Sequence, residues 1–168
     1  MTRPRTIVAT YPLPTAFPFG FPVVLDTNTI LALWMFQDPA LPHLRAAADS
    51  GHLILVTRDD CLEELAKVLA YRQFGQSPEQ QAALLAAYTE LSRPVEKDDW
   101  PTWELPRCLD RDDQKFLELA RDSGVPLLVT RDKLLLKLAK RPAIAAHFAI
   151  LTPEKLETLL AAQAAAAA

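Results

Sequence analysis

Two aspartates of this sequence stand at the ends of apolar runs of strand length. Asp26 directly follows Val23–Leu25, and Asp132 follows Leu127–Val129 with two residues between. An aspartate after Val23–Leu25 could serve as a helix N-cap, although the next two residues could cap that helix equally well. In open parallel sheets, ligands bind outside the carboxyl ends of the strands, so we expect both aspartates in a ligand site.

A glutamate on a predicted helix adds a third carboxylate. Glu64 lies three residues after Cys61 and four before Val68, so it shares a largely apolar helical stripe. A carboxylate there is costly unless something compensates its charge, which favours a site role over a glutamate that reaches water from the helix edge. Its neighbour Glu63 precedes Lys67 by four residues, the order of a solvated ion pair.

The acidic cluster at 110–113 supplies the fourth carboxylate. Asp113 precedes Phe116 and Leu117 by three and four positions, which places it on the apolar face of the helix that follows. Asp110 is placed to cap that helix, and Asp112 lies on its solvated side. Asp113 is therefore the first candidate of the cluster, with Asp110 second.

Four carboxylates at one sheet edge would repel one another. Two carboxylates about 4 Å apart repel by roughly 4 kcal/mol at an effective dielectric constant of 20, so the cluster needs protons or cations. Oxygen ligands suit hard divalent cations such as Mg²⁺, whereas none of the three histidines has a second His or Cys at zinc-ligand spacing. Such ions activate water for phosphodiester cleavage, which is the chemistry that the pattern predicts.

Basic and aromatic residues beside these segments suit a phosphate-containing substrate. Arg58, Arg111 and Arg131 stand next to the carboxylates in sequence and could hold backbone phosphates. Trp100 and Trp103 are candidates for stacking on bases.

Short apolar runs alternate with helical patterns along the chain. Near-continuous apolar runs are typical of strands covered on both faces, and the alternation implies parallel strand–helix–strand units. The predicted strands are Val23–Leu25, Leu53–Val56, Leu127–Val129 and Ala149–Leu151. The predicted helices are Thr29–Phe36, Pro42–Ser50, Asp59–Tyr71, Pro78–Ser92, Arg111–Ser123, Lys133–Lys140 and one from Pro153 onward. We therefore expect an α/β fold, a three-layer α/β/α domain with a central, mostly parallel sheet.

The remaining segments set the expected domain boundaries. Residues 1–20 form a proline-rich leader, which should be irregular because proline lacks a backbone donor. Residues 21–160 form the domain, in which the helix at Pro78–Ser92 is a helical insertion and Pro94–Pro106 is a long connection back to the sheet. Residues 161–168 form a low-complexity alanine tail that extends the last helix.

One internal echo links two strand ends. The segments ILVTRD at Ile54–Asp59 and LLVTRD at Leu127–Asp132 each end an apolar run with Thr-Arg-Asp and then open a helix. An aspartate that caps its own helix explains both copies, so the echo supports the strand–helix units more than any activity. Thr130 and Arg131 of the second copy are candidate substrate-binding residues.

Composition excludes several classes of protein. Half of the 168 residues are hydrophobic and 23% are charged, which fits one globular domain. Two cysteines are too few for a disulfide framework, and no run approaches the roughly 18 apolar residues of a membrane span, so we expect a cytoplasmic protein. The net charge of −3 argues against binding nucleic acid through a bulk positive field, but without the four candidate carboxylates the chain carries +1.

Four ordered motifs, followed by a fifth segment, carry a resemblance to a known family. They are VVLDTNTIL at Val23–Leu31, CLEELAKVL at Cys61–Leu69, CLDRDDQKFLELA at Cys108–Ala120, LLVTRDKLLLKLA at Leu127–Ala139 and ILTPEKL at Ile150–Leu156. In this order they resemble the PIN-domain family, and within it the toxin components of bacterial toxin–antitoxin systems, known as VapC-like ribonucleases. No single motif is specific, but four ordered motifs over one domain length are strong together.

The resemblance implies a parallel sheet flanked by helices and an endoribonuclease that uses Mg²⁺ or Mn²⁺. The family's acidic positions fall on Asp26, Glu64, Asp113 and Asp132, and Asn28 matches a polar position that often belongs to the site. The sequence departs from its relatives at Asp110-Arg111, where they typically have Asp-Pro, which leaves Asp110 as an alternative ligand to Asp113. The resemblance also implies a homodimer and inhibition by a small cognate antitoxin protein.

Two other functions compete with RNA cleavage. An aspartyl-phosphate phosphohydrolase would use Asp26 as its nucleophile, but such enzymes usually have a second aspartate at the position of Asn28. A catalytically inactive PIN-like binding module would have lost site residues, and none is visibly lost. Nucleotide binding through a glycine-rich phosphate loop is disfavoured because the chain has only four scattered glycines.

Overall fold

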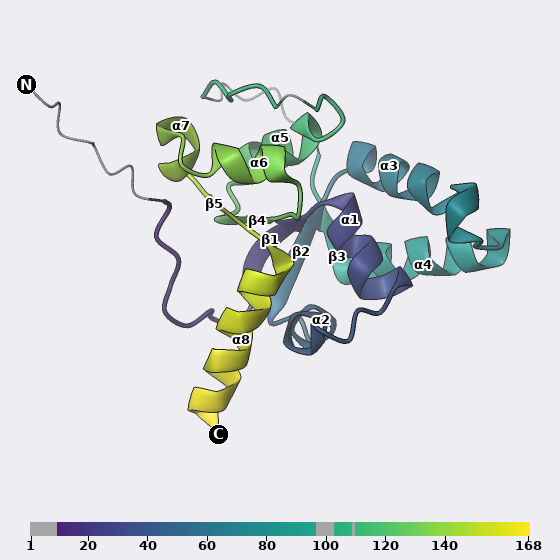
Figure 1. The fold of residues 1–168 in the computed structure, drawn as a ribbon, viewed down its shortest axis with the longest axis horizontal. Helices are drawn as coiled ribbons and strands as arrows, with labels where there is room; N and C mark the ends of the chain where they lie inside the picture. Colours follow the sequence, from purple (N-terminus) through teal and green to yellow (C-terminus); the bar gives the residue numbers. More distant parts are fainter. Residues whose placement is uncertain (1–9, 97–102, 109) are drawn as a thin grey trace, which may run out of the picture.

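The computed structural model describes residues 10–96, 103–108 and 110–168. Five strands form one sheet in the order β3-β2-β1-β4-β5, and every pairing between them is parallel (Figure 1). The strands are β1 (Phe21–Leu25), β2 (Leu53–Thr57), β3 (Ser92–Pro94), β4 (Leu127–Val129) and β5 (Ala149–Leu151). This sheet confirms the predicted α/β class.

The strand order contains one reversal, between β1 and β4. From β1 the chain adds β2 and β3 on one side and then returns to add β4 and β5 on the other. In the register, Leu25 at the end of β1 pairs with Val129 at the end of β4. The carboxyl ends of these two strands therefore lie together at the topological switch point, where open α/β sheets bind their ligands.

Eight α-helices and two shorter helical turns are present in the described residues. The helices are α1 (Thr27–Ile30), α2 (Pro42–Asp49), α3 (Asp59–Leu69), α4 (Pro78–Leu91), α5 (Gln114–Ser123), α6 (Lys133–Leu138), α7 (Pro142–Ala145) and α8 (Pro153–Ala167). A π-helical turn at Leu31–Met35 continues α1, and a 3-10 turn at Arg72–Phe74 precedes α4. Side chains cap four of the helices at their N-termini, namely Asp26, Ser77, Asp132 and Thr152.

Two apolar cores cover the two faces of the sheet. On β1, Val23 and Leu25 belong to one core and Val24 to the other, as the two-residue period of a strand requires. The first core packs α1, α2, α3, α4 and α8 on one face, and the second packs α5, α6 and α7 on the opposite face (Figure 1). The predicted three layers are thus confirmed.

One strand was not predicted. All four predicted strands are present. The fifth strand, β3 (Ser92–Pro94), lies where the sequence predicted the end of the helix at Pro78–Ser92 and the start of the connection after it. This strand has three residues, lies at the edge of the sheet and ends in proline, which an edge strand tolerates. Its composition therefore carries none of the apolar signal of a central strand.

The leader and the last helix pack against each other. Phe17 is 3% exposed and lies edge-to-face against Phe21, with ring centroids 5.0 Å apart. The amide of Gln163 on α8 accepts the Phe17 N–H at 2.7 Å and donates to the Phe17 carbonyl at 3.0 Å. Residues 10–20 form no helix or strand, as predicted, yet they contribute to the core; residues 1–9 lie outside the described part.

Within the described residues, no helix is both long enough and apolar enough to cross a lipid bilayer. Cys61 and Cys108 are both buried, and neither forms a disulfide.

Candidate active site

Asp26 lies at the switch point of the sheet, immediately after β1. Its Oδ1 accepts the Thr29 N–H at 2.9 Å and so caps α1, while its Oδ2 accepts the Thr130 hydroxyl at 2.5 Å. The side chain is buried, at 3% exposure, and burial is the main reason that its pKa lies above the usual value; the Asp132 charge adds to it. The cap that the sequence left open between Asp26 and its two neighbours is formed by Asp26 itself.

Thr130 connects the two aspartates of the switch point. This fully buried residue follows β4, donates its hydroxyl proton to Asp26 and accepts the Asp132 N–H at 2.9 Å. The sequence suggested Thr130 as a substrate-binding residue. In the structure its side chain is fully buried, and its hydroxyl joins Asp26 to the backbone of Asp132.

Asp132 caps α6 and leaves one oxygen for other partners. Its Oδ1 accepts the N–H groups of Leu134 and Leu135 at 2.8 and 3.0 Å. These bonds hold the carboxylate at the positive end of the helix dipole, next to Asp26. Asp132, in the second copy of the repeated Thr-Arg-Asp segment, therefore both caps its helix and lies beside the candidate site.

Glu64 reaches the same region from α3. Its Oε2 accepts the Thr27 hydroxyl at 2.5 Å, and its Oε1 lies 3.1 Å from the Lys115 ammonium of α5. The Glu64 side chain is 17% exposed, and Thr27 is the residue after Asp26, so α1, α3 and α5 meet here. The ammonium of Lys115 provides the compensating charge that the apolar stripe around Glu64 requires.

Asp113 joins the cluster through its charge. Burial and the negative charges of Asp110, Asp132, Asp26 and Glu64 together raise the pKa of Asp113 to about 7. The residue is half-buried just before α5, as its place on the apolar face predicts. A carboxyl surrounded by this many like charges holds its proton near neutral pH unless a cation enters the cluster.

Asp110 and Asp112 lie at the outer side of the cluster. Both are exposed, and the Asp110 Oδ1 accepts the Asp112 N–H at 2.9 Å in a turn that precedes α5. Asp110 was expected to cap α5, but this bond closes a turn before the helix begins at Gln114. Asp113 therefore lies deeper in the cluster, and Asp110 acts on it from outside through its charge.

The four carboxylates fit the chemistry of a divalent cation but do not form a ready-made binding site. Their donors are all oxygens, and burial together with their like charges raises the pKa of Asp113. Among the described side chains, however, no three acidic, histidine or cysteine groups lie close enough to hold an ion as they stand. A metal would require Glu64 to exchange Lys115 for the ion, and Asp113 to lose its proton.

The remaining predicted substrate contacts lie around this cluster. Asn28 and Arg111 are exposed, so each is accessible to a ligand. Arg131 is also exposed, and its guanidinium pairs with Asp38 at 3.1 Å and Glu154 at 2.7 Å. Trp103 stacks on His147 with ring centroids 4.1 Å apart, whereas Trp100 lies outside the described residues.

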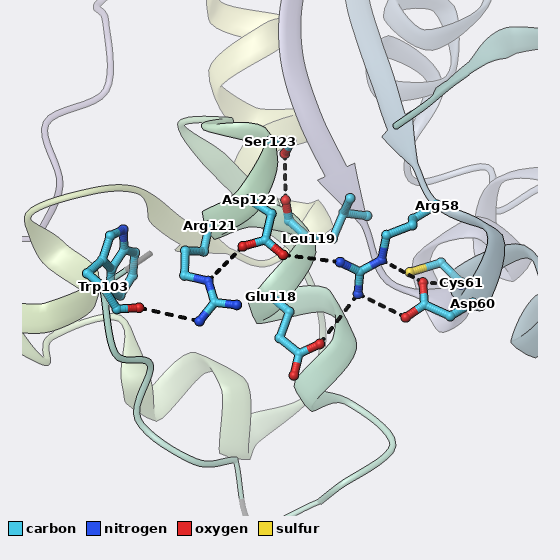
Figure 2. Close-up of polar contacts among 9 residues, drawn as sticks. All are labelled: Arg58, Asp60, Cys61, Trp103, Glu118, Leu119, Arg121, Asp122 and Ser123. Atoms are coloured by element: carbon cyan, nitrogen blue, oxygen red, sulfur yellow. Dashed lines mark hydrogen bonds and ion pairs between the residues drawn. The ribbon is translucent and has the colours of Figure 1, made fainter. Parts of the chain in front are cut away.

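Arg58 has a different place from the one predicted. The guanidinium is 3% exposed and lies within 3.4 Å of carboxylate oxygens of Asp60, Glu118 and Asp122, as Figure 2 shows. A substrate phosphate would have to displace these carboxylates from a buried position. In the structure, Arg58 connects the start of α3 to α5.

Sequence reasoning did not include Thr27 or Lys115 in the site. Thr27 follows Asp26 directly and was considered only as a cap, yet its hydroxyl holds Glu64 from another helix. Lys115 lies two residues after Asp113, and nothing in that spacing indicates that its ammonium reaches α3. Both contacts depend on how the helices pack, which no local sequence pattern records.

Comparisons with known proteins agree with this geometry. A family model described as "PIN domain" matches residues 22–134, which span β1 to the start of α6. The crystal structure of PAE2754 from Pyrobaculum aerophilum is similar, with a TM-score of 0.56 and 19% identity, and the match covers 88% of this chain and 94% of that one. At this identity the likeness supports the fold alone. No curated protein matches the chain. Because the family model covers well over half of the sequence, the chain belongs to the PIN-domain family.

Proposed function

We propose that this protein is a metal-dependent endoribonuclease that cleaves single-stranded RNA by metal-activated water. The PIN domain is a nuclease-type fold whose members usually use divalent metal ions. The observation that carries the proposal is the convergence of Asp26, Glu64, Asp113 and Asp132 at the switch point of the sheet, where burial and the neighbouring negative charges raise the pKa of Asp113 to about 7.

The proposal assigns each carboxylate a part. Asp26, Asp113 and Asp132 would hold Mg²⁺ or Mn²⁺, with Glu64 completing the site once Lys115 leaves it. The ion supplies a water of lowered pKa and a positive charge for the leaving oxygen. Thr130 keeps Asp26 and Asp132 in place, and the backbone N–H groups at the starts of α1 and α6 hold one oxygen of each.

The reaction has a definite product. The oxygen of water attacks phosphorus, the bond from phosphorus to the 3′ oxygen breaks, and that oxygen takes up a proton. The products are therefore a 5′-phosphate and a 3′-hydroxyl. Attack by the neighbouring 2′-hydroxyl would instead leave a cyclic phosphate.

The competing phosphohydrolase reaction at Asp26 is disfavoured by the residue two positions after it. Asn28, at the position where such enzymes have a second aspartate, is exposed and carries no acid.

The test is a cleavage assay on a fluorescent single-stranded RNA with identification of the product ends. We expect cleavage with Mg²⁺ or Mn²⁺, none in excess EDTA, recovery when the metal is restored, and 5′-phosphate ends. Undiminished cleavage in EDTA, or cyclic phosphate ends, would contradict the proposal. Binding of RNA without any cleavage would indicate the inactive binding module instead.

We further propose that this nuclease is the toxin of a toxin–antitoxin pair, acting in the cytoplasm as a homodimer. The support is the order of its sequence motifs, which resembles that branch of the family. A short reading frame beside the gene should encode the antitoxin. Expression of the chain alone should arrest growth, and co-expression of that neighbour should restore it; growth unaffected by the active nuclease would contradict the assignment.

A further inference from the structure

A large basic hollow lies beside the acidic cluster. It has a volume of about 900 Å³ and runs between the segment 103–108 and α5. Four of its lining side chains are basic and two are acidic. The basic ones are Arg107, Arg111, Lys115 and Arg121, and the acidic ones are Glu104 and Glu118. This local excess of positive charge contrasts with the net charge of −3 of the whole chain.

The charges of the hollow are arranged to leave its outer part positive. Glu118 lies 3.4 Å from the buried guanidinium of Arg58, which also pairs with Asp60 and Asp122, so the charge of Glu118 is offset in part (Figure 2). Arg121 is fixed by Asp122 at 2.8 Å and by the Trp103 carbonyl at 3.3 Å, so it forms part of the wall. Arg107 and Arg111 are exposed, so their positive charges are accessible to a ligand.

The hollow adjoins the proposed active site at Lys115, whose ammonium lies 3.1 Å from Glu64. Lys115 also lines a second hollow, of about 280 Å³, together with Glu64 and Asp112. Arg111 lies in the turn that precedes α5, whereas Lys115 and Arg121 lie on α5, six residues or about 9 Å apart along the helix axis. All three cations line the same hollow.

We propose that this hollow, from Arg107 and Arg111 to Lys115, binds the ribose-phosphate backbone of single-stranded RNA and leads it to the carboxylates. The inference rests on the proposed function and adds the path of its substrate. Arginine suits phosphate because its guanidinium binds two oxygens at once. An acidic protein segment would also match the basic walls. RNA is favoured because the hollow adjoins the proposed nuclease site, and a competition with an acidic peptide separates the two ligands.

The test measures binding of a fluorescent single-stranded RNA at several salt concentrations. The variant that removes two cations of the hollow, named the groove variant, is Arg107→Gln/Arg111→Gln. The matched control is Lys140→Gln/Arg141→Gln, which removes two exposed cations outside the hollow. Binding is measured in the Asp26→Asn background with Mg²⁺ and, because that buried substitution could impair folding, also without it in EDTA. Each phosphate contact on a single strand contributes about 0.7 to the slope of log K against log salt concentration.

We expect the groove variant to bind RNA at least about tenfold more weakly at low salt and to lower that slope by about 1.4, while the control matches its parent. Equal binding by the two double variants would overturn the proposal. So would a polyglutamate peptide that displaces the RNA at equal charge concentration, since it would assign the hollow to a protein partner. Failure of the nuclease proposal has a different signature, which is intact groove-dependent binding without metal-dependent cleavage.

Discussion

At Asp26, one carboxylate caps a helix and forms part of a candidate metal site. The position could be predicted, because an aspartate directly after a buried strand lies at the ligand-binding edge of a parallel sheet. Its partners could not, because Thr130 is 104 positions away in the sequence. The same limit applies to Glu64: its stripe indicated that a compensating group was needed, but only the packing of α3 against α5 identifies Lys115.

The raised pKa of Asp113 predicts how stability depends on pH without metal. This pKa is about 7 in the folded protein and near 3.8 when unperturbed. Between these values the folded protein binds more protons than the unfolded chain, so the free energy of unfolding falls as pH rises from about 4 to about 7. Asp113→Asn should make this decrease in the free energy of unfolding smaller. Part of the decrease should remain, because the pKa of Asp26 is raised as well.

Urea denaturation at pH 5, 6, 7 and 8 in EDTA measures this dependence. Asp112→Asn, an exposed neighbour, should keep the pH dependence of the wild type. If the free energy of unfolding decreases equally with pH in Asp113→Asn and Asp112→Asn, Asp113 does not hold the proton that its raised pKa implies.

Lys115 predicts a measurable effect on metal binding. Its ammonium occupies Glu64 at 3.1 Å, so an ion that uses Glu64 must first displace it. Lys115→Met keeps most of the side-chain volume and removes the charge, and it should tighten Mn²⁺ binding by about tenfold, or roughly 1.4 kcal/mol. Calorimetric titration of the RNA-free protein gives the affinity.

Lys67 provides the matched comparison, because it lines the same small hollow and is exposed. Lys67→Met should change Mn²⁺ affinity much less than Lys115→Met. Weaker Mn²⁺ binding by Lys115→Met would show that Lys115 supports the ion site instead of competing for it.

Among the secondary-structure elements, the buried strands and the amphipathic helices could be predicted from the sequence. The elements that were not predicted are short or polar. β1, β2, β4 and β5 are apolar runs, and α2, α3 and α4 lie within one or two residues of their predicted bounds. The edge strand β3 has two polar residues and a proline, and α7 has only four residues, so neither produces a periodic signal. The contacts of Arg58 could not be predicted, because adjacency to a site segment does not show which way a side chain turns.

The Arg58 network predicts a structural cost for its loss. The buried guanidinium joins α3 to α5 through Glu118 and Asp122, and Arg58→Met would leave Asp122, 9% exposed, with Arg121 as its remaining cation (Figure 2). We expect the free energy of unfolding to fall by about 3 kcal/mol, as for a broken buried ion pair. Urea denaturation measures it.

Glu118→Gln tests the half-exposed side of the same network and should cost less than about 1 kcal/mol. A loss below 1 kcal/mol for Arg58→Met would mean that the guanidinium is not needed to hold the two helices together.

Across the whole molecule, the proline-rich leader is part of the packed structure. Its lack of regular structure was predictable from its prolines, but its attachment was not, because Phe17 meets Gln163 across 146 positions. Phe17→Ala should lower the free energy of unfolding by about 3 kcal/mol, the usual cost of emptying a buried phenylalanine site. Phe19→Ala, at a residue that is 74% exposed, should change it by less than about 0.5 kcal/mol.

Thermal or urea denaturation of the two variants side by side decides this point. Equal stability of Phe17→Ala and Phe19→Ala would show that the leader does not contribute to the fold.

The distribution of charge over the molecule bears on the central claim. The acidic groups that make the chain negative gather at the switch point, and basic side chains line the hollow beside it. The most direct test compares the rate of Mg²⁺-dependent cleavage of single-stranded RNA by Asp26→Asn, which removes a buried charge of the cluster, with that by Asp49→Asn, which removes an exposed charge outside both hollows. Asp26→Asn should cleave at least about 100-fold more slowly, corresponding to roughly 2.7 kcal/mol of transition-state stabilisation, while remaining folded, and Asp49→Asn should cleave at nearly the wild-type rate. A folded Asp26→Asn protein that cleaves RNA as fast as Asp49→Asn would contradict the account.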